Sequence, residues 1–284
     1  MRRETRPVAG LVIASVVLAF SSLALIVAAV FSAEGWHLGP LDGGAAAYVA
    51  MSGDLLGIAV LAASLWGLAT TRGGRVRRWL RRSAALLVAW AVLSASWRFL
   101  LPMTAGTDAE TIFYELFTPE DVLPRTAGPA IVNSMLALWA VASVVFVFAQ
   151  LALHVATLNE RESDPLKRLP VTGWLIAAAL SFLGTLLVVF ALGTQLVSGQ
   201  MSEVFLPGAF LKTIVAPCLF AGAYAEGAQW GWRHSVGRGR VGARRPKPGV
   251  SRGEARSDLH GRGEREGVVP SPLGPAFDAY ESER

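Results

Sequence analysis

The chain has 284 residues, of which 53% are hydrophobic and only 17% are charged, and its formal net charge is +5. Soluble domains carry about 25% charged residues. The lower charged fraction of this chain, together with its long uncharged apolar runs, excludes an ordinary soluble protein. The single cysteine, Cys218, excludes an intrachain disulfide framework, a CxxC redox centre and a thiolate metal cage. The arginine-rich, asparagine-poor composition is typical of a GC-rich bacterial genome.

Six segments are long and apolar enough to cross a membrane as helices, because one crossing takes about 20 residues. They are residues 8–31, 46–70, 83–101, 129–157, 171–198 and 205–232. Glycine, proline or charged residues interrupt the chain between successive segments. The sequence therefore predicts an all-α, polytopic integral membrane protein with a six-helix transmembrane domain over residues 1–232.

The positive charges predict the orientation of this domain. If the amino terminus is cytoplasmic, all but three of the 26 Lys and Arg residues lie on the cytoplasmic side or in the tail. The exceptions are Arg98, Arg125 and Lys212, while the loops on the other side carry acidic residues. Because cytoplasmic loops are enriched in Lys and Arg, we expect both termini in the cytoplasm of a bacterium and the bundle in its plasma membrane.

Residues 233–284 differ from the rest, because they are rich in arginine, glycine and proline and poor in apolar residues. Such a segment cannot build a core, so we expect a disordered cytoplasmic tail. Its basic beginning lies next to the last span, where Lys and Arg bind anionic lipid. No aromatic residue is interleaved with that basic run, which disfavours nucleic acid as a partner.

A short amphipathic helix is predicted in the long outer loop, over residues 107–121. It begins with a capping box, Thr107 to Glu110, followed by apolar residues at helical spacing. Two arrangements are compatible with this pattern. The helix lies in the outer headgroup zone, which requires no partner and is the favoured arrangement, or it folds over the mouth of the bundle as a lid.

Ionisable residues inside a span are costly, so each one marks a candidate functional site. Asp54 must lie in the second span, since residues 55–70 alone are too short to cross. At a rise of 1.5 Å per residue it lies about 9 Å below the outer boundary, and Arg98 on the next helix lies about 4–5 Å deep. The depths predict an Asp54–Arg98 ion pair, which either fastens two helices or binds a substrate or proton.

Two further charges, Lys212 and Glu226, flank the apolar centre of the last span. They are 14 residues or about 21 Å apart on a straight helix, so they cannot pair. Pro217 between them is expected to kink the helix. We expect both side chains, and Lys212 above all, to extend toward the membrane surface; a kinked helix in a gated pathway is the alternative.

Other residues are expected to hold the helices together. Three amide side chains are predicted to form interhelical hydrogen bonds: Asn133, Gln150 and Gln195. Small residues at a spacing of four allow close approach of a neighbouring helix: Gly53, Gly57, Gly227 and Gly231. That neighbour is either another helix of the same bundle or a second copy in a homo-oligomer.

The sequence contains no cluster of acid, base, nucleophile or metal ligands, so no metal or cofactor is expected. The function predicted first is therefore a non-enzymatic, permease-like component that transports a small molecule, with Asp54, Arg98 and Glu226 along the pathway. An accessory or scaffold subunit of a larger membrane complex is the alternative. A third is a membrane-embedded lipid-processing enzyme that uses Asp54 or Glu226 as a base.

Overall fold

The computed structural model describes residues 2–34, 43–107, 109, 111–112, 126–161, 164–199 and 202–242. Every regular element in these ranges is a helix, and six helices are long and apolar enough to cross a membrane. The apolar stretches are Arg6–Ala28, Tyr48–Thr71, Gly74–Thr104, Pro129–Leu158, Val171–Ser198 and Phe205–Trp230. The all-helical, six-span prediction is thus confirmed, and the chain has the features of a multi-pass membrane protein.

Four spans are single helices: α1 (Arg2–Glu34), α2 (Gly43–Thr71), α6 (Pro129–Leu158) and α7 (Val171–Ser198). The third span is composite, because α3 (Gly74–Ala95) continues through the π-helical turn η1 (Ser96–Leu100) into α4 (Leu101–Thr104). The sixth span is built in the same way from α8 (Phe205–Phe210), the π-helical turn η3 (Leu211–Val215) and α9 (Ala216–Gly242). A short 3-10 helix, η2 (Pro165–Arg168), precedes α7.

Three helices are markedly longer than the hydropathy predicts, and the first of them, α1, begins six residues before and ends three residues after its predicted bounds. The third span begins at Gly74 rather than at residue 83, because the arginine-rich stretch after Gly74 is itself helical. Arginine is a good helix former, and charge limits only the membrane-embedded part of a helix. The last helix continues to Gly242, ten residues beyond its predicted end. Of the predicted disordered tail, residues 243–284 lie outside the described residues.

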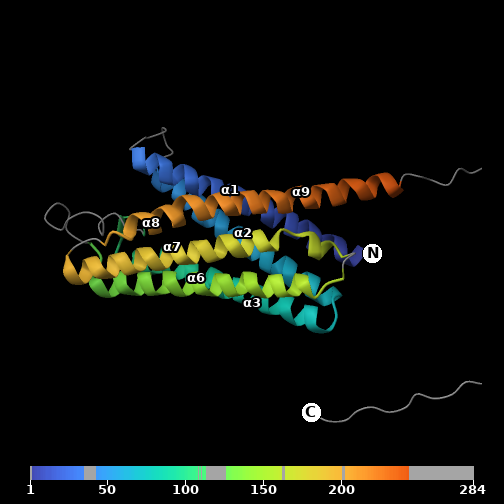
Figure 1. The fold of residues 1–284 in the computed structure, drawn as a ribbon, viewed down its shortest axis with the longest axis horizontal. Helices are drawn as coiled ribbons and strands as arrows, with labels where there is room; N and C mark the ends of the chain where they lie inside the picture. Colours follow the sequence, from blue (N-terminus) through green and yellow to red (C-terminus); the bar gives the residue numbers. More distant parts are fainter. Residues whose placement is uncertain are drawn as a thin grey trace, which may run out of the picture. The chain divides into compact units, whose positions relative to one another are not determined.

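Each span packs against the next one along the chain, and the sixth returns to the first. Contacts join α1 to α2, α2 to α3, α3 to α6, and α6 to α7. The turn η3 contacts both α7 and α1, so the six spans enclose a common interior (Figure 1). Leucine, alanine and tryptophan side chains fill much of this interior, and Trp174 is fully buried.

The predicted glycine contacts lie within the bundle. A methyl group at Gly57 would come within 2.7 Å of Leu18 of α1, and one at Gly53 would meet Ser21 of the same helix. A methyl group at Gly227 of α9 would lie 3.1 Å from the Ser15 hydroxyl. Three of the four glycines therefore serve packing between helices of one chain; the surroundings of Gly231 are not described.

The beginning of the predicted loop helix folds onto the bundle. Ala109 and Ile112 are buried in an apolar cluster with Met135 of α6 and with Val188 and Leu192 of α7. This part of the loop thus covers the ends of α6 and α7, which contradicts a position on the membrane surface without partners. The rest of the 107–121 prediction, from residue 113 on, lies outside the described residues.

Candidate functional site

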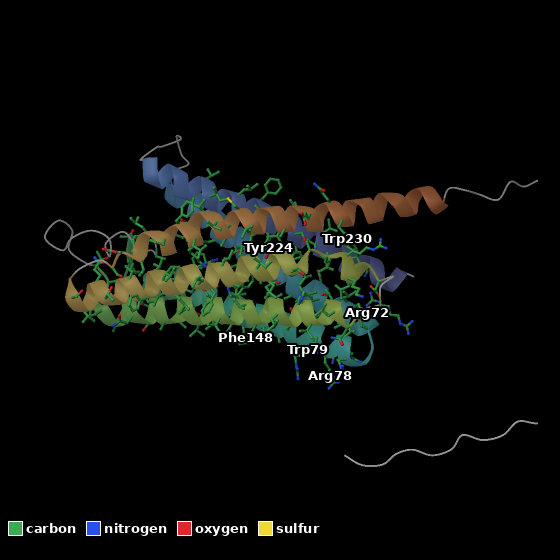
Figure 2. All side chains as sticks on the ribbon, viewed as in Figure 1. Arg72, Arg78, Trp79, Phe148, Tyr224 and Trp230 are labelled. Carbon is green, nitrogen blue, oxygen red and sulfur yellow. The ribbon has the colours of Figure 1, made fainter. Side chains whose placement is uncertain are left out.

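A cavity of about 410 Å³ lies among the six spans, and every span contributes to its lining. Most lining residues come from the parts of the helices nearest the loops at 35–42, 105–128 and 199–204. The walls are largely apolar and include Tyr224, which lies between α9 and α7 in Figure 2. Three charged side chains also line the cavity: Asp54, Arg98 and Lys212.

The predicted ion pair between Asp54 and Arg98 is present. Both terminal nitrogens of Arg98 lie 3.3 Å from one carboxylate oxygen of Asp54, and one of them also donates to the Met51 carbonyl at 3.5 Å. The guanidinium lies over two indole rings, 5.6 Å from the centre of Trp90 and 5.1 Å from that of Trp97. Ionic, hydrogen-bonding and cation–π contacts therefore fix the Arg98 side chain at the cavity wall.

The position of Lys212 differs from the one predicted from the sequence. Its side chain points into the cavity instead of extending toward the membrane surface. Its ammonium group donates to the Ser181 hydroxyl of α7 at 2.6 Å and lies 5.7 Å from the centre of the Trp139 ring. None of the ion pairs found among the described residues includes Lys212. The cavity thus contains a cation without a carboxylate partner in that part of the chain.

A proline follows each π-helical turn and explains it. Pro102 and Pro217 stand two residues after η1 and η3, respectively. A proline cannot donate to the carbonyl four residues earlier, and its ring crowds that carbonyl. The backbone hydrogen bonds of the helix lengthen from four to five residues at this point. The amide of Leu101 donates to the carbonyl of Ser96, and the amide of Ala216 donates to the carbonyl of Leu211. Such π turns are frequent at functional sites, and here each one holds a cavity cation.

A crossing of two glycines positions Lys212. Gly184 of α7 and Gly208 of α8 face each other, and a methyl group on Gly184 would lie 2.9 Å from the backbone nitrogen of Lys212. A methyl group on Gly208 would lie 3.0 Å from the backbone nitrogen of Val188. Only glycine at both positions allows this approach, which brings the backbone of η3 against α7. Neither glycine has another small residue four positions away, so the spacing of small residues in the sequence did not indicate this contact.

The remaining predicted residues lie elsewhere or lack the expected contacts. Glu226 is exposed and does not line the cavity, so its place on a pathway stays a prediction. Asn133 is exposed as well. Gln150 is fully buried, yet neither of its polar atoms has a hydrogen-bond partner in the described structure, and the carbonyl oxygen of Gln195 also has none there. The predicted interhelical hydrogen bonds of these amides are absent from that part of the structure.

No protein-family model, no curated protein and no solved structure matches this chain. The function of the chain is therefore inferred from the chemistry of the cavity. Within the described residues, no group of three or more His, Cys, Asp or Glu side chains lies close enough to hold a metal ion. The two cations and one carboxylate of the cavity give it a formal charge of plus one.

Proposed function

We propose that this chain is a permease-like component that binds a small molecule in the cavity between its six spans. The observation that supports this most directly is the presence of three charged side chains in a cavity lined by every span. Its volume of about 410 Å³ falls in the range of ligand sites, roughly 300–1,000 Å³. Charges held inside a membrane protein typically mark a substrate or ion pathway.

The proposed setting is the plasma membrane of a bacterium, with both termini in the cytoplasm. The distribution of Lys and Arg supports this orientation. It places the loop at 105–128 and the chain around residues 199–204 outside, and the cavity nearer to the outer surface. A ligand would then enter from outside or from the outer leaflet, beside the segment that contains Ile112.

The alternative function as an accessory subunit has lost part of its support. An accessory subunit could use the small residues of its spans as contacts with a partner, but Gly53, Gly57 and Gly227 face neighbouring helices of the same chain. Copurification from native membranes in mild detergent tests this alternative. A stoichiometric partner protein would favour an accessory role.

The transport proposal is tested with a variant that fills the cavity. Ala142 of α6 is buried and lines the cavity, whereas Ala137 of the same helix is exposed. Proteoliposomes are incubated with a mixture of small metabolites, and the compounds taken up are identified by mass spectrometry. We expect at least one compound to accumulate with the parent and with Ala137→Phe but not with Ala142→Phe. Uptake that is identical in all three preparations would contradict the proposal.

A further inference from the structure

Resting on the proposed function, we infer that the cavity selects a monoanionic organic acid, a carboxylate attached to an apolar body. Asp54 neutralises Arg98 through their ion pair, whereas Lys212 has no ion pair among the described residues. A buried charge without a partner is costly, and one ligand carboxylate would balance it. A ligand cation would instead add to the excess positive charge.

The hydrogen-bond donors near Lys212 suit a carboxylate. An ammonium group has three donors, and a single one is used, toward Ser181, in the described structure. Because the Ser181 hydroxyl accepts this bond, its own proton remains available to an acceptor in the cavity. Two N–H groups of Lys212 and the O–H group of Ser181 are thus available in one region of the wall, a number of donors that matches the two oxygens of a carboxylate.

The remaining walls suit an apolar body rather than a free inorganic anion. Trp97 and Trp139 pack with ring centres 5.9 Å apart, and Trp90 lies 5.2 Å from the ring of Phe146. All four side chains line the cavity. An inorganic ion bound at Lys212 would leave these aromatic surfaces in contact with water, whereas an alkyl or aryl group would cover them. The acid group and the apolar body therefore have separate places in the cavity.

The test uses the full-length protein in phosphatidylcholine nanodiscs, with tryptophan fluorescence and thermal unfolding as readouts. The probes are decanoate, decanol and decylamine, which share one chain and differ in charge, and the water-soluble acid 3-phenylpropanoate. We expect decanol and decylamine to bind at least about tenfold more weakly than decanoate, a difference of about 1.4 kcal/mol. Binding of 3-phenylpropanoate would identify water as a source of the acid, whereas binding of decanoate alone would identify the bilayer.

Variants assign the selection to Lys212. Lys212→Met is expected to weaken decanoate binding at least about tenfold, Lys212→Arg to retain most of it, and Lys167→Met, at an exposed lysine outside the spans, to leave it unchanged. If Lys212→Met does not fold, Ser181→Ala serves as a second test and is expected to weaken binding severalfold. Equal binding of decanoate by the parent and by the tested variant would overturn the inference, as would failure of both acids to bind.

The inference and the proposed function fail in different ways. If decanol or decylamine binds as tightly as decanoate and Ala142→Phe abolishes the binding, the cavity is a ligand site without selection for an anion. That result overturns the inference and leaves the proposed function in place. If no probe binds and the metabolite uptake experiment shows no difference between variants, both are wrong.

Discussion

Arg98 and Lys212 lie in similar places in two different helices: each lies in a π-helical turn that ends two residues before a proline, Arg98 four residues and Lys212 five residues before it. Both side chains reach the same cavity, one from the third span and one from the sixth. The proline imposes the wider turn, and the turn changes which side chain of the helix faces the interior. The irregular backbone and the charges of the candidate site are therefore coupled, because each π-helical turn carries one of the two cations of the cavity.

The first prediction concerns this coupling. Pro217→Ala restores a backbone donor, so we expect the free energy of unfolding to rise by about 1–3 kcal/mol. The turn η3 then tightens and Lys212 is displaced, so decanoate binding should weaken. Pro207→Ala is the matched control, because Pro207 lies in the first turn of α8, where a backbone donor has no intrahelical partner. Equal effects of the two substitutions on decanoate binding would contradict the assigned role of the π turn.

The ion pair of Asp54 and Arg98 is tested by a double-mutant cycle on unfolding in detergent. Asp54→Asn and Arg98→Gln each leave one charge without its partner, so both are expected to destabilise the protein. The double substitution should recover part of the loss, with a coupling energy of about 0.5–3 kcal/mol. A coupling energy indistinguishable from zero would show that the two side chains do not interact.

The glycine crossing gives a third prediction, with a control on the same helix. Gly184→Ala places a methyl group against the backbone of Lys212, so we expect a loss of about 1–3 kcal/mol in unfolding free energy. A methyl group on Gly193 meets nothing within 4 Å, and Gly193→Ala should be neutral or stabilise by up to about 1 kcal/mol. Two variants of equal stability would be incompatible with the crossing.

An ion-pair cluster outside the spans joins the turn after α2 to the turn after α6. Arg72, labelled at one end of the bundle in Figure 2, lies 3.0 Å from Glu160 and 2.7 Å from Asp164. Burial raises the pKa of the Glu160 carboxyl above its ordinary value of 4.5, and nearby Asp164 acts in the same direction, against the effect of Arg72. The folded protein therefore holds the Glu160 proton more tightly than the unfolded chain does.

The fourth prediction follows from the sign of that shift. Glu160 contributes most to stability below pH 4.5, and this contribution is lost as the pH rises through the raised pKa. We expect the melting temperature of the parent, relative to that of Glu160→Gln, to fall between pH 4 and pH 7. Glu203→Gln, at an exposed site, is the control. A constant difference between parent and Glu160→Gln over this range would exclude the predicted dependence.

The spans and the Asp54–Arg98 pair could be predicted from the sequence, because hydrophobic length and depth along a helix are one-dimensional quantities. The position of Lys212 could not, because it depends on the rotation of the sixth helix about its axis, which the π turn before Pro217 changes. The contact of Gly184 with Gly208 was missed for a related reason, since it depends on where two helices cross. The burial of Ile112 depends on tertiary packing that an amphipathic pattern does not specify.

The proposed function requires that solutes in water reach the positively charged cavity inside the bundle. This requirement is tested by thiol labelling in a Cys218→Ala background, which removes the single native cysteine. Met51 of α2 lines the cavity and is partly exposed, whereas Leu56 of the same helix is 60% exposed and does not line the cavity. Met51→Cys and Leu56→Cys are therefore a matched pair for small charged methanethiosulfonate reagents added outside.

We predict that the anionic reagent labels Met51→Cys at least about tenfold faster than the cationic one, because the charge of the cavity attracts it. Adding Lys212→Met should reduce this preference. Leu56→Cys, outside the cavity, should show no preference between the two reagents. Failure of Met51→Cys to react, or faster labelling by the cationic reagent, would contradict the account.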